Sequence, residues 1–296
     1  MISRRELLGT LLALGAGGAT RADAPPDPVA TSVGTSASPL RFGLTPVILD
    51  DRVSFLRQWS TWLSARLRRP VVFVQRGRYR EILDLLLRGG LDLAWICGYP
   101  YVQHQTDLSL IAVPRFQGQP LYRAYVIVGA EASFQSLEDL KGRLFAWSDP
   151  DSNSGYLFPR YQLAQSGEDP DRYFRRAFFT WGHRHCVEAM AAGLADGAAV
   201  DGYVWETLAR REPALTARTR VVLRSPLFGF PPLVAAPGLP GADLETLRRV
   251  VLAQADDADG RRLLGELNLD GFSAEGPALF LDIAHMAGLV RRAVDP

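Results

Sequence analysis

Short apolar strands alternate with amphipathic helices along the chain, and this alternation constrains the fold more than any other feature. Strand-like segments lie at 40–44, 71–74, 91–96 and 122–128, and helical spacing of apolar residues occurs at 54–63 and 79–88. Strands separated by helices indicate a mostly parallel α/β sheet. The first third of the chain therefore predicts one α/β unit.

The same alternation restarts after residue 130. A helix is indicated at 136–140, a strand at 144–147, a helix opening near Ser154, a helix at 186–193 and a strand at 198–200. The chain then returns through 221–223 and closes with helices at 243–255, 259–266 and 275–290. We therefore predict two α/β lobes, one of residues 39–127 and 222–296 and one of residues 128–221. Two hinge crossings would join them and leave a ligand cleft between them.

The N-terminus has the pattern of a cleaved export signal. Paired arginines, Arg4 and Arg5, directly precede an apolar run at 9–19 that is too short to span a bilayer, and a small-x-small site follows at 22–24. Residues 1–24 resemble a twin-arginine signal; an ordinary Sec signal with a fortuitous arginine pair is the alternative. No cysteine follows the run to carry a lipid anchor, so we expect a periplasmic protein. Residues 25–38, rich in Pro, Ser, Thr and Ala, predict a disordered leader.

The balanced net charge and the absence of common catalytic motifs exclude several classes of function. The chain has 33 basic and 32 acidic side chains, so no polybasic surface is available for nucleic acid or anionic lipid. It contains no G-x-S-x-G elbow, no phosphate-binding P-loop and no H-E-x-x-H helix. Asp92 and Asp196 each follow a predicted helix and begin a strand, a setting that does not suggest a catalytic pair. We therefore expect a binding protein without a cofactor and not an enzyme.

A run of small polar residues at 149–156 is the most informative local feature. It reads Asp-Pro-Asp-Ser-Asn-Ser-Gly-Tyr and lies between a strand and a helix. Hydroxyl and amide side chains beside the free N–H groups of a helix start form an anion site without net positive charge. An ordinary helix N-cap has the same composition, so both interpretations remain open here.

Two further segments could carry chemistry. His183, His185 and Cys186 precede or open a helix, but their spacing matches no closed zinc site and the chain has only four histidines, so we expect no metal. Cys97 follows a buried strand, at the sheet edge where ligands of α/β proteins gather. A lone cysteine there is either a small buried hydrophobe or a reactive thiol. In an exported protein a disulfide between Cys97 and Cys186 is a further alternative.

Taken in order, these motifs resemble the phosphate/phosphite/phosphonate-binding periplasmic proteins of ABC importers. The resemblance covers residues 39 to about 290 and rests on Leu40-Arg41-Phe42-Gly43, Tyr79, Asp92-Leu93-Ala94-Trp95, Leu137 to Gly142, Asp149 to Gly155, and Gly182-His183 with Gly193 and Asp196. It implies the two-lobed, transferrin-like type II fold. It also implies a monomeric receptor that closes on a small oxyanion and delivers it to a membrane permease.

The resemblance assigns ligand-binding residues position by position. The oxyanion site would comprise Tyr79 from the first lobe, with the run Ser152-Asn153-Ser154 and His183 from the second. The family more often has Ser-Thr-Ser, so Asn153 exchanges a hydroxyl for an amide that can still donate an N–H. Where aminoalkylphosphonate receptors hold an ammonium group with carboxylates, this chain has Tyr203 and Pro231. We therefore expect aminoalkylphosphonates to bind poorly.

Cys97 also resembles a feature of the family's arsenite-binding branch, whose members present arsenite to a sensor histidine kinase. Thiolate suits trivalent arsenic and not a hard phosphate oxygen. Cys186, one helical turn beyond His183, would then offer a second sulfur, and a Cys97–Cys186 disulfide would block the site. An arsenite-binding accessory protein is therefore the alternative to the oxyanion receptor.

Overall fold

The structure is a computed structural model that describes residues 38–47 and 52–294. The predicted export signal at 1–24 lies outside the described residues, as does all but the last residue of the predicted leader. No helix in the described part of the chain is long and apolar enough to cross a membrane.

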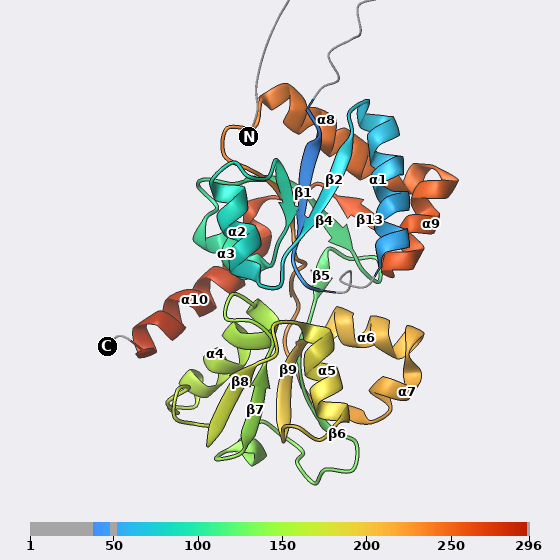
Figure 1. Cartoon of the computed structure of the whole chain (residues 1–296). Helices are drawn as coiled ribbons and strands as arrows, with labels where there is room; N and C mark the ends of the chain where they lie inside the picture. The colour runs from blue at the N-terminus through green and yellow to red at the C-terminus, as the bar shows by residue number, and fades with distance from the viewer. Residues whose placement is uncertain (1–37, 48–51, 295–296) are drawn as a thin grey trace, which may run out of the picture. The chain divides into compact units, whose positions relative to one another are not determined.

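A six-stranded sheet collects strands from both ends of the described chain (Figure 1). Its order is β13-β4-β12-β3-β1-β2, with bounds β1 Leu40–Leu44, β2 Val71–Gln75, β3 Leu93–Trp95, β4 Ser109–Arg115, β12 Leu233–Ala235 and β13 Gly271–Ser273. The helices that accompany it are α1 Val53–Leu67, α2 Tyr79–Leu87, α3 Gly98–Gln103, α8 Gly241–Leu252, α9 Ala258–Leu267 and α10 Leu281–Val294. Short 3-10 turns cover Ala253–Asp256 and Pro277–Phe280.

A five-stranded sheet is built from the middle of the chain. Its order is β10-β6-β9-β7-β8, with bounds β6 Ala124–Gly129, β7 Leu144–Trp147, β8 Arg176–Phe179, β9 Gly197–Asp201 and β10 Thr219–Arg224. Its helices are α4 Phe158–Gln165, α5 His183–Ala191, α6 Gly202–Arg211 and α7 Pro213–Thr216. The helix expected at 136–140 is only a 3-10 turn at Glu138–Leu140.

Both sheets are mixed, so the expectation of mostly parallel sheets is wrong. β1 pairs in parallel with β2 and β3, but β12 and β13 are antiparallel to their neighbours. In the other sheet β7 is parallel to β8 and β9, whereas β6 is antiparallel to β9 and β10. β6 and β12 are the strands by which the chain enters one sheet from the other, where no helical crossover sets a parallel direction. β13 follows β12 through helices α8 and α9 and keeps the direction of β12, so both are antiparallel to β4.

The chain passes between the two sheets twice, and the two passages are tied together. Strand β5, Leu121–Tyr122, pairs with β11, Phe228–Gly229, in a short antiparallel ribbon. Ser225 and Ala124 also make two hydrogen bonds with each other. The Ser225 N–H donates to the Ala124 carbonyl at 2.9 Å, and the Ser225 hydroxyl accepts from the Ala124 N–H at 2.8 Å. The two passages therefore form one braced connection.

Asp92 and Asp196 brace equivalent strand starts in the two sheets. The Asp92 carboxylate accepts from the Arg41 N–H at 2.7 Å, and the Asp92 N–H donates to the Arg41 carbonyl. Asp196 accepts from the Leu144 N–H at 2.8 Å and donates to the Leu144 carbonyl in the same way. Both carboxylates complete a strand pairing, and their expected positions at strand starts are confirmed.

Candidate ligand-binding site

The polar run after β7 is buried. Ser148, Asp149, Ser152, Asn153 and Ser154 are each at most 1% exposed. Residues Asn153–Leu157 form one turn of π-helix that leads into α4, and the Ser152 hydroxyl caps this turn by accepting from the Gly155 N–H at 2.9 Å. The helix start expected near Ser154 is therefore confirmed. Burial of so many polar side chains is costly unless a partner satisfies them.

Three polar atoms of this run lack such a partner among the described residues. They are Ser148 Oγ, Asn153 Oδ1 and Ser154 Oγ. Asn153 is otherwise held in place, because its Nδ2 donates to the Tyr122 hydroxyl at 2.9 Å. Buried polar side chains are nearly always hydrogen-bonded, so three orphaned atoms within seven residues mark a place where a polar ligand belongs.

Gly155 allows the run to close on itself. A Cβ at this position would lie 1.6 Å from Ser148 Oγ and 3.1 Å from His183 Cε1. Only glycine therefore lets the π-turn pack against both side chains. The same geometry shows that Ser148, Gly155 and His183 are immediate neighbours.

Tyr79 and His183 are in contact, although Tyr79 opens α2, which accompanies the six-stranded sheet, and His183 opens α5, which accompanies the five-stranded sheet. The Tyr79 hydroxyl lies 3.1 Å from His183 Nε2, and both side chains are at most 2% exposed. His183 Nδ1 accepts from the Asp201 backbone N–H at 3.0 Å, so the ring proton is on Nε2. Nε2 therefore donates to the Tyr79 oxygen, and this leaves the Tyr79 hydroxyl proton free to donate to a ligand.

The electrostatic environment contains buried carboxylates and a neutral imidazole. Burial lowers the pKa of His183 to about 3, raises the pKa of Asp149 to about 6 and raises that of Asp201 to about 7. Asp149 orients the site, because it accepts from the Tyr79 N–H at 3.1 Å and the Asp151 N–H at 2.8 Å. Binding at this place would rest on neutral donors and not on a cation.

The two cysteines are free thiols, so the disulfide left open by the sequence is not formed. Cys97 Sγ accepts from the Asn153 N–H at 3.2 Å, which places it against the polar run. Cys186 lies instead 3.1 Å from the Thr180 hydroxyl and 3.9 Å from the Ala146 carbonyl. Burial raises the pKa of both thiols to about 12. No group of three or more His, Cys, Asp or Glu side chains in the described ranges could hold a metal ion.

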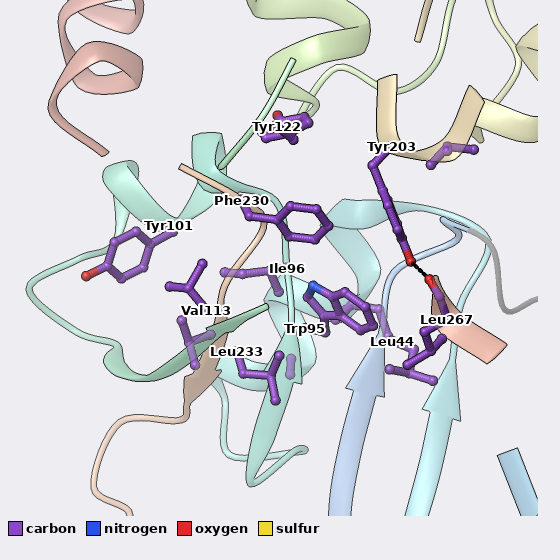
Figure 2. Close-up of a cluster of buried hydrophobic side chains, with 14 of the residues drawn as sticks. Leu44, Trp95, Ile96, Tyr101, Val113, Tyr122, Tyr203, Phe230, Leu233 and Leu267 are labelled. Carbon is purple, nitrogen blue, oxygen red and sulfur yellow. Dashed lines mark hydrogen bonds between the residues drawn. The ribbon is translucent and has the colours of Figure 1, made fainter. Parts of the chain in front are cut away.

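Tyr203 lines an apolar cavity, and Asp201 of the same lining donates its backbone N–H to His183. The Tyr203 hydroxyl donates to the Leu267 carbonyl, as Figure 2 shows, and the Tyr203 ring packs against Phe230 with centroids 4.9 Å apart. The cavity has a volume of about 20 Å³, room for about one water-sized group. Its lining is mainly apolar and consists of Leu44, Thr45, Val47, Trp95, Asp201, Tyr203, Phe230, Pro231 and Leu267.

The structure thus brings Tyr79, His183, Asn153, Ser154 and Cys97 together, while Ser152 caps the turn and Tyr203 lines the adjacent cavity. The sequence analysis missed two residues of this cluster, Ser148 and Tyr122. Ser148 directly follows strand β7, and the end of a parallel strand was a usable signal. Tyr122 lies on a passage between the sheets, and its sequence neighbours give no indication of a site.

Comparisons with known proteins identify the family of the chain. The family model described as "ABC transporter, phosphonate, periplasmic substrate-binding protein" matches residues 42–277. A probable ABC transporter phosphite binding protein, PhnD1, from Prochlorococcus marinus is 25% identical over 189 residues, which are 61% of this chain and 63% of that protein. The match thus spans less than two thirds of that relative's length.

Solved structures share the fold. A binding protein component of an ABC phosphonate transporter from Pseudomonas aeruginosa superposes with a TM-score of 0.79 at 23% identity, over 86% of this chain and 87% of that one. PhnD1 from Prochlorococcus marinus in complex with methylphosphonate gives a TM-score of 0.78 at 21% identity, over 86% and 98% of the two chains. The expected type II periplasmic binding protein fold is confirmed. Because the family model covers most of the described residues, the chain belongs to the periplasmic substrate-binding proteins of phosphonate ABC transporters.

Proposed function

We propose that this protein is the receptor of an ABC importer and captures a small phosphorus oxyanion of the phosphite or methylphosphonate class. One observation carries the proposal: three polar side-chain atoms, Ser148 Oγ, Asn153 Oδ1 and Ser154 Oγ, are buried without partners beside Tyr79 and His183. Membership of the family supports the ligand class and the importer.

Neutral donors would hold the oxyanion. The serine hydroxyls of Ser148 and Ser154 have no other partner, and the Tyr79 proton is freed because His183 Nε2 donates to its oxygen. Each hydrogen bond to a charged oxygen contributes about 1.5–3 kcal/mol. Several such bonds inside a site closed to water account for binding without an arginine or lysine.

We place the substituent on phosphorus toward the apolar cavity lined by Tyr203, because Asp201 on its wall donates its backbone N–H to His183. The cavity's room for about one water-sized group suits a hydrogen or methyl substituent and excludes an ammonium-bearing chain. Asp201 lies on its wall, but this carboxylate already caps α6 by accepting from the Val204 N–H, and burial raises its pKa. It is therefore a poor counter-charge, which agrees with the expectation that aminoalkylphosphonates bind weakly.

Tryptophan fluorescence and calorimetry test the proposal on the mature, reduced chain, since Trp95 lines the cavity. Phosphite or methylphosphonate should saturate one site, and Ser154→Ala should weaken binding about ten- to a hundredfold by removing one donor to the anion. 2-Aminoethylphosphonate should bind at least about tenfold more weakly than methylphosphonate. Failure of every phosphorus oxyanion to bind would refute the proposal.

Arsenite serves as the contrasting ligand in the same titration. The structure gives arsenite a single thiol at the site, because Cys186 contacts Thr180 and Ala146 and not the polar run. We therefore expect no saturation by arsenite in the wild type. Saturation by arsenite that is lost in Cys97→Ser would overturn the assignment of the ligand.

Delivery to a membrane permease and a periplasmic location complete the proposal, and both are supported by the family. A receptor returns its ligand unchanged, so no product should form when methylphosphonate is incubated with the protein for hours. Turnover would show an enzyme. Docking to a sensor kinase and a monomeric state stay predictions, which a pull-down with the permease or kinase domain and a sedimentation experiment would check.

A further inference from the structure

Asn153 contributes an acceptor where every other unpartnered group at the site can donate. Its Nδ2 donates to the Tyr122 hydroxyl, so the side-chain atom left without a partner is the carbonyl oxygen Oδ1. The residue is fully buried and its backbone N–H is held by Cys97 Sγ, so it cannot swing out to reach water. An acceptor that is buried and fixed beside an anion needs a ligand that brings a proton.

The charges around the polar run also favour a ligand that carries a proton and a single negative charge. The titratable and charged groups in or against it are Tyr79 and Arg80 from α2, Cys97 before α3, Tyr122 from β5, Asp149 and Asp151 after β7, Tyr156 of the π-turn and Arg160 of α4, His183 from α5 and Asp201 after β9. Both cations in this set are already paired, Arg80 with Asp151 at 2.7 Å and Arg160 with Asp171 at 2.6 Å. A second negative charge on the ligand would therefore be opposed by buried carboxylates and met by no free cation.

We propose that the site selects the monoanionic, protonated form of its ligand, with the P–OH group donating to Asn153 Oδ1. This inference rests on the proposed function and narrows its substrate class to oxyanions that carry an acidic proton. Sulfonates and sulfate bear no such proton at neutral pH and would leave Oδ1 unpaired. The site would discriminate against them through one amide oxygen.

A matched pair of ligands isolates this proton. Methylphosphonate monoanion and methanesulfonate have the same charge and nearly the same shape, and they differ by the hydroxyl proton. Calorimetry on the mature wild-type chain at about pH 6 should show methylphosphonate binding at least about tenfold more tightly. Equal affinity of the two would overturn the proposal, because Asn153 would then present its N–H₂ group to the ligand.

The pH dependence gives a second readout. Above the second ionisation of methylphosphonate the monoanion becomes scarce, so its affinity relative to methanesulfonate should fall by up to about tenfold per pH unit. Methanesulfonate does not titrate in this range, so its own pH profile reports the protein's groups, including Asp149 and Asp201. A ratio that stays constant or rises with pH contradicts the inference.

Two variants distinguish the loss of the Asn153 acceptor from a general loss of ligand binding. Asn153→Ala removes Oδ1, together with the Nδ2 contact to Tyr122, without adding volume to the buried site, so the preference for methylphosphonate over methanesulfonate should shrink by about tenfold. Ser154→Ala removes a donor and should weaken both ligands in proportion, with the preference retained. Melting temperatures identify any variant that fails to fold. The ratio of the two ligands' affinities for the wild-type protein tests the proposal even if a variant does not fold. If neither ligand nor phosphite binds, the proposed function itself fails.

Discussion

Single side chains at this site differ in how far the sequence reveals them. Ser154 belongs to a residue type that favours helix starts, whereas His183 was assigned through the family resemblance, and the structure places both at helix starts. The tautomer of His183 could not be predicted, because its partner is the backbone N–H of Asp201, eighteen positions away. The place of Tyr122 at the site could not be predicted for the same reason, because only the folded chain brings it to Asn153.

Gly155 offers a direct test of packing at the residue scale. Gly155→Ala would place a methyl group 1.6 Å from Ser148 Oγ, so we expect a loss of about 1–3 kcal/mol in unfolding free energy together with weaker ligand binding. Gly265→Ala in α9 is the control, since a Cβ there meets nothing within 4 Å, and it should stabilise the protein by about 0.5–1 kcal/mol. Urea unfolding of both variants decides the matter. A neutral Gly155→Ala would show that the turn is not closely packed.

Asp201 predicts a pH dependence of stability. Its folded pKa is raised from 3.8 to about 7, so its favourable contribution is complete below pH 3.8 and is lost as the pH rises through about 7. Asp201→Asn keeps the helix cap and cannot ionise. The variant should therefore gain stability relative to wild type between those pH values, by up to about 1.4 kcal/mol per pH unit. Urea titrations of the unliganded proteins at several pH values measure the gap; a gap independent of pH would contradict the assignment.

At the scale of elements, the alternation of strands and helices predicted β1, β2 and β3 of the six-stranded sheet but not β4, β12 and β13, and it predicted every strand of the five-stranded sheet except β8. Helix α6 is absent from the predicted elements, because it opens with Gly202, Tyr203 and Val204, which are poor helix formers. The Asp201 side chain, which caps it, provides the start that these residues do not. Strand β8 was missed as well, because it is a partly exposed edge strand with no apolar alternation. Strand direction was mispredicted because pattern alone does not encode it.

The paired strand braces give a prediction for elements. Asp196→Ala removes one hydrogen bond to the Leu144 N–H and should cost about 1 kcal/mol of unfolding free energy. Asp92→Ala should cost more, because Asp92 also binds the half-exposed Arg41 guanidinium at 3.2 Å. Surface ion pairs are screened by salt, so the excess should diminish in about 1 M salt. Denaturant unfolding at low and high salt checks both values, and an excess unaffected by salt would rule out the ion pair as its source.

For the whole molecule, a few polar contacts hold the two sheets' segments together at the site. Tyr79 reaches His183, Arg80 reaches Asp151, and Cys97 receives the Asn153 N–H. The division into lobes at 39–127 with 222–296 and at 128–221 stays a prediction; β6 and β10, at the passages, both pair within the five-stranded sheet. The exact passage points depend on pairing across the chain, which local sequence does not determine.

Arg80 tests whether these contacts set affinity through closure. Arg80→Ala removes the contact with Asp151 without touching a ligand donor, so affinity should fall about two- to fivefold, mainly through faster dissociation. Selectivity among oxyanions should not change. Arg88→Ala, on an exposed residue just after the same helix that pairs weakly with Asp84 at 3.9 Å, is the matched control and should bind as wild type does. Stopped-flow fluorescence measures both rates; a change confined to association would instead indicate electrostatic steering.

The three unpartnered atoms of Ser148, Asn153 and Ser154 also bear on what happens when no nutrient is present. Each buried, unsatisfied polar group costs about 1–3 kcal/mol, and opening the site to water removes that cost. An empty receptor is thus penalised for adopting its closed form, whereas a loaded one is not. If the importer recognises the closed form, the side chains that bind the ligand also disfavour closure of the empty receptor. They would thereby limit ATP hydrolysis by the importer in the absence of ligand.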